Sequence, residues 1–373
     1  MSNKMKISSS QIFWMIASME IGMTLLLTIA PAIRDAKQDA WISMIIGSIA
    51  SILITYIIVK VSLLYPNQTF IEYSQTILGK WLGKIIVIPY FFMWYSVSGV
   101  ILRESSDFLH LSLFYQTPLW IVVLMLALVI VYMTYSGGIE TIARCSEIFG
   151  PLIIITLVIV TILSVNNLRM HRILPVYADS GWQAILKGSL PITSFLGESA
   201  MLIMLVPFAV KQNKVLPRAL WGVTVSSIVI CITTLTVILT FGNIAADMWY
   251  PFNRMIRFIS IMEFIQNIDA LVVILWLLSV FIKLSMYLFI MSYGTAQWLG
   301  IKNWKNMVWI AAIISFVIAV AFPDIDAAAM EYPTKIWTPY IFPIDIVAIP
   351  LILWIIGIIR KKVGANKTPA TEQ

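Results

Sequence analysis

Long stretches without a charged residue constrain this chain more than any other feature of its sequence. Residues 108–139 and 219–246 contain no Asp, Glu, Lys or Arg, and each could cross the ~30 Å hydrocarbon core of a bilayer as an α-helix. Only 12% of all residues are charged, against about 25% in soluble domains, and the mean hydropathy is +0.92. The sequence therefore excludes a soluble enzyme, a nucleic-acid binder and a disordered chain, and favours an all-α membrane protein.

The apolar stretches predict ten membrane-spanning helices joined by short connections, which leave no room for a separate soluble domain. A β-barrel would instead show short segments of alternating polarity. The predicted spans are residues 11–33, 41–64, 83–108, 118–136, 141–164, 189–209, 217–241, 268–292, 304–321 and 338–360.

The Lys and Arg residues predict the orientation of these spans. If both termini are cytoplasmic, most Lys and Arg residues outside the spans fall in cytoplasmic connections, as the positive-inside rule requires. Three connections are themselves amphipathic. Residues 69–80 predict an interfacial helix on the inner side, and residues 181–187 and 255–268 predict outer helices, which either cover the bundle or act as a lid.

Two glutamates in the middle of predicted spans are the strongest functional signal. A charge at the bilayer centre costs ~3 kcal/mol or more, which makes Glu20 and Glu198 candidates for a functional site. They lie in spans one and six, at matching distances from the span starts, near Gly22 and Gly197 respectively. Interrupted spans at matching positions of two halves are typical of transporters built from inverted repeats. A role as hydrogen-bonded packing residues is the alternative for each glutamate.

The matched spans divide the chain into two predicted repeats of five spans, residues 11–165 and 187–361, and a short cytoplasmic tail at 362–373. Lys283 lies near the middle of span eight, where it could pair with Glu20 or Glu198, replace a coupling cation, or form a static structural ion pair.

A second group of charges ends span three. The spacing of Arg103 and Asp107 predicts an i,i+4 ion pair, and we group Glu104 with them at an outer interface or an outer gate. Asp345 is expected near the outer end of span ten. Two cysteines and two histidines make a metal cluster or a histidine-based active site improbable on composition alone, so we expect neither enzyme activity nor a cofactor.

With these residues assembled, the chain resembles the B subunits of spore nutrient-germinant receptors, which are similar to permeases of the amino acid–polyamine–organocation superfamily. The residues that carry the resemblance are Leu190-Pro191, Leu196-Gly197-Glu198, Tyr250-Pro251-Phe252-Asn253-Arg254, Glu263-Phe264, Asp269, Trp276 and Lys283. The resemblance covers essentially the whole chain.

The resemblance implies a LeuT-like fold of five plus five inverted helices. It also implies a small nutrient, commonly an amino acid such as alanine, bound between spans one, three, six and eight. Its expected partners are an A-type membrane subunit and a C-type lipoprotein in the inner membrane of a spore. The expected ligand-binding residues are Glu20, Ile21, Gly22, Phe195, Leu196, Gly197, Glu198 and Lys283.

Three functions remain open at this point. The chain is expected to be a sensor that signals through partner subunits when its nutrient shifts the population of conformers. The alternative is an amino-acid permease coupled to protons or ions, since the same cavity serves both. A channel is a third class. The sequence does not separate the first two.

Overall fold

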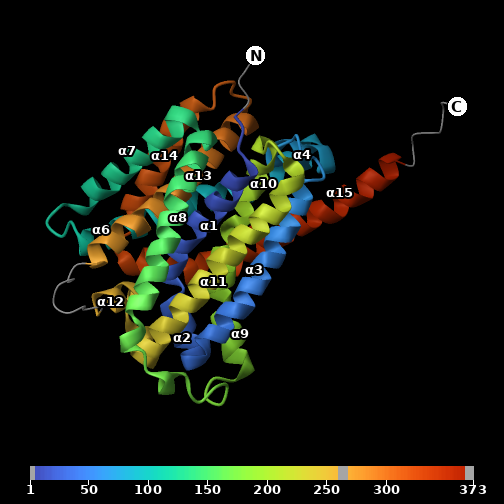
Figure 1. Cartoon of the computed structure of the whole chain (residues 1–373). Helices are drawn as coiled ribbons and strands as arrows, with labels where there is room; N and C mark the ends of the chain where they lie inside the picture. The colour runs from blue at the N-terminus through green and yellow to red at the C-terminus, as the bar shows by residue number, and fades with distance from the viewer. Residues whose placement is uncertain (1–4, 259–267, 366–373) are drawn as a thin grey trace.

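The structure, a computed structural model, describes residues 5–258 and 268–365 and is almost entirely helical (Figure 1). Within these ranges nine helical segments are long and apolar enough to span a membrane, and the slightly shorter apolar helix Lys305–Ala321 makes a tenth. The all-α fold with multiple membrane spans is therefore confirmed.

The α-helices have the following bounds: α1 Ser9–Leu27, α2 Ile29–Ala36, α3 Ala40–Ser62, α4 Phe70–Leu78, α5 Lys80–Ile85, α6 Ile88–Ser112, α7 Leu119–Gly137, α8 Ile139–Leu163, α9 Gly181–Leu196, α10 Leu202–Leu205, α11 Val215–Phe241, α12 Pro251–Arg257, α13 Ile268–Leu299, α14 Lys305–Ala321 and α15 Ile349–Ala365. The 3-10 turns are η1 Lys37–Asp39, η2 Val165–Asn167, η3 Met170–Ile173, η4 Gly197–Met201, η5 Val206–Phe208, η6 Gln212–Lys214 and η7 Gly242–Asp247, and the π-helical stretches are η8 Ala327–Glu331 and η9 Pro333–Ala348.

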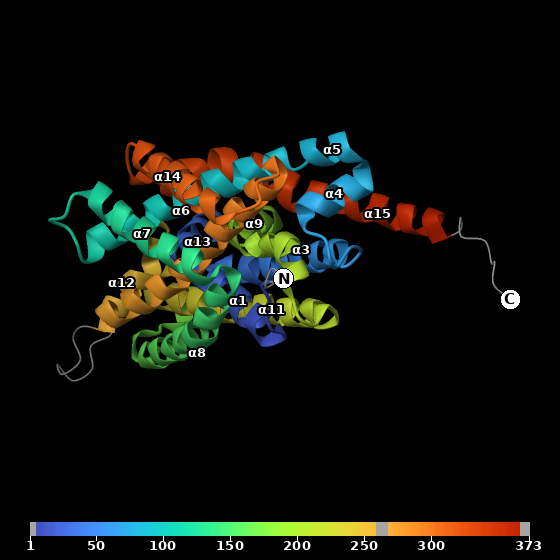
Figure 2. The same cartoon turned by 90° about the horizontal axis from the view of Figure 1, so that it is seen from above.

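Helix α1 runs through the middle of the bundle, where it packs against α8, α9, α11 and α13 (Figures 1 and 2). Together with the segment from α9 to η5 and with α13, it is among the most buried of the spans, whereas fewer than half of the residues in the apolar windows of α7 and α8 are buried. The three spans that carry Glu20, Glu198 and Lys283 thus form the centre of the protein.

Span one is interrupted, at a position beyond its glycine. The helix continues through Glu20 and Gly22 and ends at Leu27, and α2 begins after Thr28. Pro31 explains the position of the break. It lacks an N–H for the Leu27 carbonyl, and its ring crowds that carbonyl. The interruption expected in span one is therefore present, and it lies at Thr28, past Glu20 and Gly22.

Span six breaks at the glycine that the sequence singles out. Helix α9 ends at Leu196, and the chain continues as the 3-10 turn η4, the single α-turn α10 and the 3-10 turn η5. Gly197 is a poor helix former, and a Cβ there would lie 3.3 Å from Ile346 of span ten. The break places Glu198 in a tightened turn at the centre of the bundle.

Span ten begins earlier than predicted. The π-helical stretches start at Ala327 and lead into α15, so the span covers Ala327–Lys362 instead of 338–360. Pro339 and Pro343 remove N–H donors, and wide π-turns accommodate them. Asp345 consequently lies near the middle of the span and is buried, not at its outer end as expected.

The predicted connections agree only partly with the structure. The inner amphipathic segment is present as α4 and is followed by the short helix α5. Residues 181–187 are helical as expected, but they form the first turns of α9 and not a separate short helix. Of the expected helix at 255–268, α12 covers the beginning, and residues 259–267 lie outside the described part of the chain. The expected tail at 362–373 is described only to Ala365, as the end of α15.

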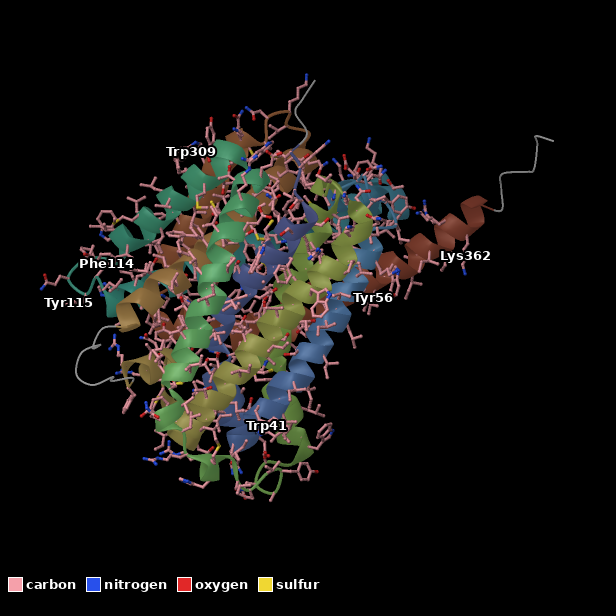
Figure 3. All side chains as sticks on the ribbon, in the orientation of Figure 1. Trp41, Tyr56, Phe114, Tyr115, Trp309 and Lys362 are labelled. Atoms are coloured by element: carbon pink, nitrogen blue, oxygen red, sulfur yellow. The ribbon has the colours of Figure 1, made fainter. Side chains whose placement is uncertain are left out.

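Aromatic and apolar side chains cover the outside of the bundle. Trp41 lies at one end of it, Phe114 and Tyr115 occupy the connection between α6 and α7, and Trp309 lies on α14 (Figure 3). Helix α15 leads away from the bundle and carries Lys362 near its end (Figure 3). Exposed apolar side chains along the spans are those expected of a surface that faces lipid.

Helices α3 and α9 approach closely at Gly47, and this contact makes a first prediction. A Cβ at Gly47 would lie 2.8 Å from the Ser189 carbonyl oxygen and 2.1 Å from Cγ2 of Ile192. Gly47→Val should therefore destabilise the protein by about 1–3 kcal/mol through overpacking. Ala50→Val, at a half-buried position of the same helix, is the control. Equal melting temperatures of the two purified variants would contradict the prediction.

Candidate functional site

Glu198 is held by two side chains of α13. Lys283 Nζ donates to Glu198 Oε1 at 3.0 Å, and the Tyr287 hydroxyl donates to Glu198 Oε2 at 2.6 Å. All three residues are buried. Both carboxylate oxygens of Glu198 are thus satisfied, as a charge in a low-dielectric interior requires.

The polar residues of α13 form one stripe. Trp276, Ser279, Lys283 and Tyr287 are separated by three or four residues, a spacing that places them on the same face of a helix. Analysis of the sequence missed Tyr287 and Ser279, although their spacing from Lys283 was the signal that could have found both.

The N-terminal part of this stripe, Trp276 and Ser279, contacts the backbone of α1. The Gly22 N–H donates to Ser279 Oγ at 3.0 Å, and that hydroxyl donates to the Ser18 carbonyl. Trp276 Nε1 donates to the Gly22 carbonyl at 3.0 Å. Ser279 thus contacts the N–H and the C=O that a regular helix pairs with each other. Gly22 permits this approach, because a Cβ there would lie 2.5 Å from Ser279 Oγ.

Glu20 faces the same centre from α1. Its side chain is fully buried, and within the described chain neither carboxylate oxygen makes a hydrogen bond of ordinary geometry. Lys283, Glu198 and the backbone of Ser199 are its electrostatic neighbours. Lys283 therefore lies near both predicted carboxylates, but it pairs with only one of them.

The charges of span three point in two directions. Arg103 Nε pairs with Asp107 at 2.9 Å, which confirms the predicted i,i+4 pair, and the guanidinium also donates to the carbonyls of Ala319 and Phe322. Glu104 does not join this pair, so our grouping of it at the outer interface is wrong. Its buried side chain faces Lys283 and Glu198 instead, because consecutive residues of a helix point about 100° apart.

The remaining predicted residues lie around this cluster. The ring of Phe195 is 5.8 Å from Lys283 Nζ, and Phe195 also lines an outer cavity of about 80 Å³. Ile21 and Leu196 belong to an apolar cluster away from the charges. Gly197 packs against Ile346 of span ten.

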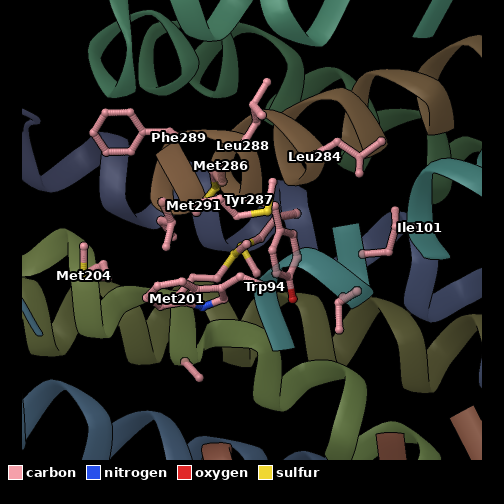
Figure 4. Packing of buried hydrophobic residues seen from close by; sticks show 14 of the residues in the cluster. Trp94, Ile101, Met201, Met204, Leu284, Met286, Tyr287, Leu288, Phe289 and Met291 are labelled. Carbon is pink, nitrogen blue, oxygen red and sulfur yellow. The ribbon is translucent and has the colours of Figure 1, made fainter. Parts of the chain in front are cut away.

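Apolar packing closes the centre on the side of spans three and six. Trp94, Met201 and Met204 pack around Tyr287 and its neighbours on α13 (Figure 4). A larger cavity of about 510 Å³ opens between the end of span six, the start of α4 and the end of α13, lined among others by Phe208, Glu72 and Gln297. No group of three metal-ligating side chains occurs among the described residues.

The helical bundle and its interrupted sixth span define a polytopic membrane protein of transporter-like architecture. Its fold is similar to that of Mhp1, a nucleobase-cation-symport-1 family transporter solved in a closed conformation with bromovinylhydantoin, with a TM-score of 0.66 over 86% of this chain and 73% of that one, at 14% identity. MhsT in complex with L-phenylalanine matches with a TM-score of 0.67 over 95% of this chain and 89% of that one, at 13% identity. The fold is thus that of the LeuT-like transporters.

The sequence comparisons identify the family. The family model described as spore germination protein matches residues 6–326. Spore germination protein KB of Bacillus subtilis (strain 168) is 26% identical over 96% of both chains, and spore germination protein YndE of the same organism is 24% identical over 90% of this chain and 92% of that one. The chain belongs to the spore germination protein family.

The ion pair of Lys283 and Glu198 makes a second prediction. Lys283→Met leaves Glu198 buried without a counter-charge and should destabilise the protein by about 3–5 kcal/mol. Adding Glu198→Gln removes the stranded charge and should restore much of that loss, as measured by thermal unfolding of the purified protein. A double variant no more stable than Lys283→Met would show that the two side chains do not interact as described.

Proposed function

We propose that the chain is the membrane subunit of a nutrient germinant receptor and binds a small nutrient, in the class of amino acids, between spans one, three, six and eight. The observation that carries the proposal is the position of Glu198. It lies in the 3-10 turn η4, where span six is interrupted, and it is held by Lys283 and Tyr287 of span eight. A buried charge cluster at a helix break is a feature of binding sites in transporter folds.

The cavities support this location. Phe195 lines the outer cavity of about 80 Å³, and Pro207 and Phe208 line the inner cavity of about 510 Å³. These residues precede and follow Glu198 along span six, so the two cavities approach the centre from opposite ends. The proposed binding residues are Glu20, Ile21, Gly22, Phe195, Leu196, Gly197, Glu198 and Lys283. Ile21 and Leu196 contribute through their backbone, since their side chains pack elsewhere.

The family suggests how binding is converted into a signal. Relatives of the chain carry the name spore germination protein, and MhsT, which shares the fold, is described in complex with L-phenylalanine. We propose that the nutrient shifts the population of two arrangements of spans one and six, which an A-type membrane subunit and a C-type lipoprotein detect in the inner membrane of a spore. In this proposal both termini are cytoplasmic and the two repeats comprise residues 11–165 and 187–361.

An amino-acid permease is the second candidate, because the fold neighbours include transporters and the chain has cavities on both sides of the centre. Uptake of labelled alanine into liposomes that contain the purified protein separates the two functions. Binding without uptake supports a receptor. Uptake that Glu20→Gln or Glu198→Gln abolishes identifies a permease.

Replacement of Glu198 makes the third prediction. Glu198→Gln keeps the size of the side chain but removes the charge that orients Lys283 and Tyr287, and we expect nutrient binding to weaken at least ~tenfold, equivalent to ~1.4 kcal/mol. Isothermal titration of the purified protein in nanodiscs with alanine and other amino acids measures this loss. Glu331→Gln, which removes an exposed glutamate paired with Lys335, is the control. Unchanged affinity in Glu198→Gln would contradict the proposed site.

A further inference from the structure

Helix α5 exposes three large apolar side chains at the start of span three. Trp81, Leu82 and Ile85 are 79%, 62% and 57% exposed. The preceding helix α4 instead buries its apolar side chains, among them Phe70 and Tyr73, in the bundle. The interfacial surface that the sequence places on residues 69–80 is therefore found one helix later. A cluster of exposed apolar side chains of this kind marks a binding surface.

The length of span three places α5 at the surface of the membrane. The segment Lys80–Ser112 has 33 residues. A straight helix of this size is ~50 Å long, and a tilt of ~20° shortens its projection only to ~47 Å. The hydrocarbon core is only ~30 Å thick. Because the segment exceeds the core and carries Lys80 and Lys84 in its first turns, α5 lies among the lipid headgroups, where tryptophan and lysine are both favoured.

The end of α15 lies beside the same helix pair. The Ser74 hydroxyl of α4 donates to the Gly83 carbonyl of α5 at 3.0 Å. Arg360 of α15 donates to the Thr76 carbonyl of α4 at 3.2 Å. Helix α4 thus joins α5 to α15, and Figure 2 shows the three helices together at one edge of the bundle.

The cations of these two helices are not neutralised by acids. Among the residues that the structure describes, none of them is paired with a carboxylate. Lys84 and Arg360 donate to backbone carbonyls, which carry no net charge. The carboxylate of Glu72 instead caps α4 by accepting from the Thr69 N–H at 2.8 Å. The cations of the surface, which we call the α5–α15 surface, are Lys80, Lys84, Arg360, Lys361 and Lys362.

We propose that the α5–α15 surface binds the headgroups of anionic phospholipids, in the inner leaflet of the topology proposed above. Trp81, Leu82 and Ile85 lie at the boundary of headgroups and acyl chains, and the cations contact the phosphates. Each Lys or Arg near an anionic membrane strengthens the attraction about fivefold. The exposed side chains of α5 also adjoin Ile88 and Phe92, so the surface continues the face that span three already presents to lipid.

A fluorescent label on α5 tests the apolar part of the surface. Trp81→Cys is labelled with bimane in a protein without its native thiols (Cys145→Ala, Cys231→Ala) and reconstituted into nanodiscs without any nutrient. Failure of this proposal is therefore distinguishable from failure of nutrient binding. We expect phosphatidylcholine with a nitroxide on its acyl chain to quench the label, and iodide in the water to quench it weakly.

The same label tests the headgroup contacts. In nanodiscs with equal amounts of phosphatidylglycerol and phosphatidylcholine, the nitroxide is placed on one lipid or the other. We expect quenching to show phosphatidylglycerol enriched about fivefold or more next to the label, and Lys80→Gln/Lys361→Gln to lower this enrichment about fivefold or more. Lys187→Gln/Lys335→Gln is the control, because it removes the same charge from exposed lysines that are paired with acids.

Two results would overturn the proposal. Equal quenching by the two lipids, or an enrichment that Lys80→Gln/Lys361→Gln leaves unchanged, would show that the cations do not bind anionic headgroups. A label at position 81 that iodide quenches and nitroxide lipid does not would show that α5 lies in water. The exposed apolar side chains would then indicate a protein partner in place of lipid.

Discussion

The pair of Lys283 and Glu198 is the interaction on which the centre of this protein depends. A charge in the middle of a bilayer is costly, and removing either partner leaves the other without compensation. The pair therefore fixes which face of α13 packs against span six, and at which position along the two segments they are in contact. Tyr287 completes it by donating a hydrogen bond to the second oxygen of Glu198, within a surrounding layer of Trp and Met side chains.

The same face of α13 also orders span one. Ser279 and Trp276 bind the backbone of α1 at Ser18 and Gly22, one and two turns away along α13 from the contact of Lys283 with span six. One helix thus holds both interrupted spans through a single polar stripe. Because spans one and six pack on a common helix, a ligand that moved one of them would strain contacts with the other. This arrangement provides a physical basis for two alternative packings of the centre.

Much of this architecture could be predicted from hydropathy, since the cost of burying charge in lipid is strong enough to mark the spans, Glu198 and Lys283 from sequence alone. The remaining features depend on local backbone sterics and tertiary contacts, which hydropathy does not report. The direction of Glu104 depends on the rotation of α6, and the break of span one follows Pro31 and not Gly22. The early start of span ten escaped prediction because its prolines suggest a helix end, whereas wide turns carry the helix through them. The spacing of Tyr287 from Lys283 could have placed both on one face of a helix, but the sequence did not show that the Tyr287 hydroxyl donates to Glu198.

The excess of acid at the centre has a consequence for any function of the cluster. Glu20, Glu104 and Glu198 surround one lysine, and only Glu198 is ion-paired with it. In a medium of low dielectric constant the remaining carboxyls have to be neutralised by protons or by a cationic group such as an ammonium. These two modes exclude each other at a given carboxyl, because a protonated oxygen no longer attracts a cation. A nutrient that brought an ammonium group to the proposed site would therefore displace a proton from the carboxyl that it binds.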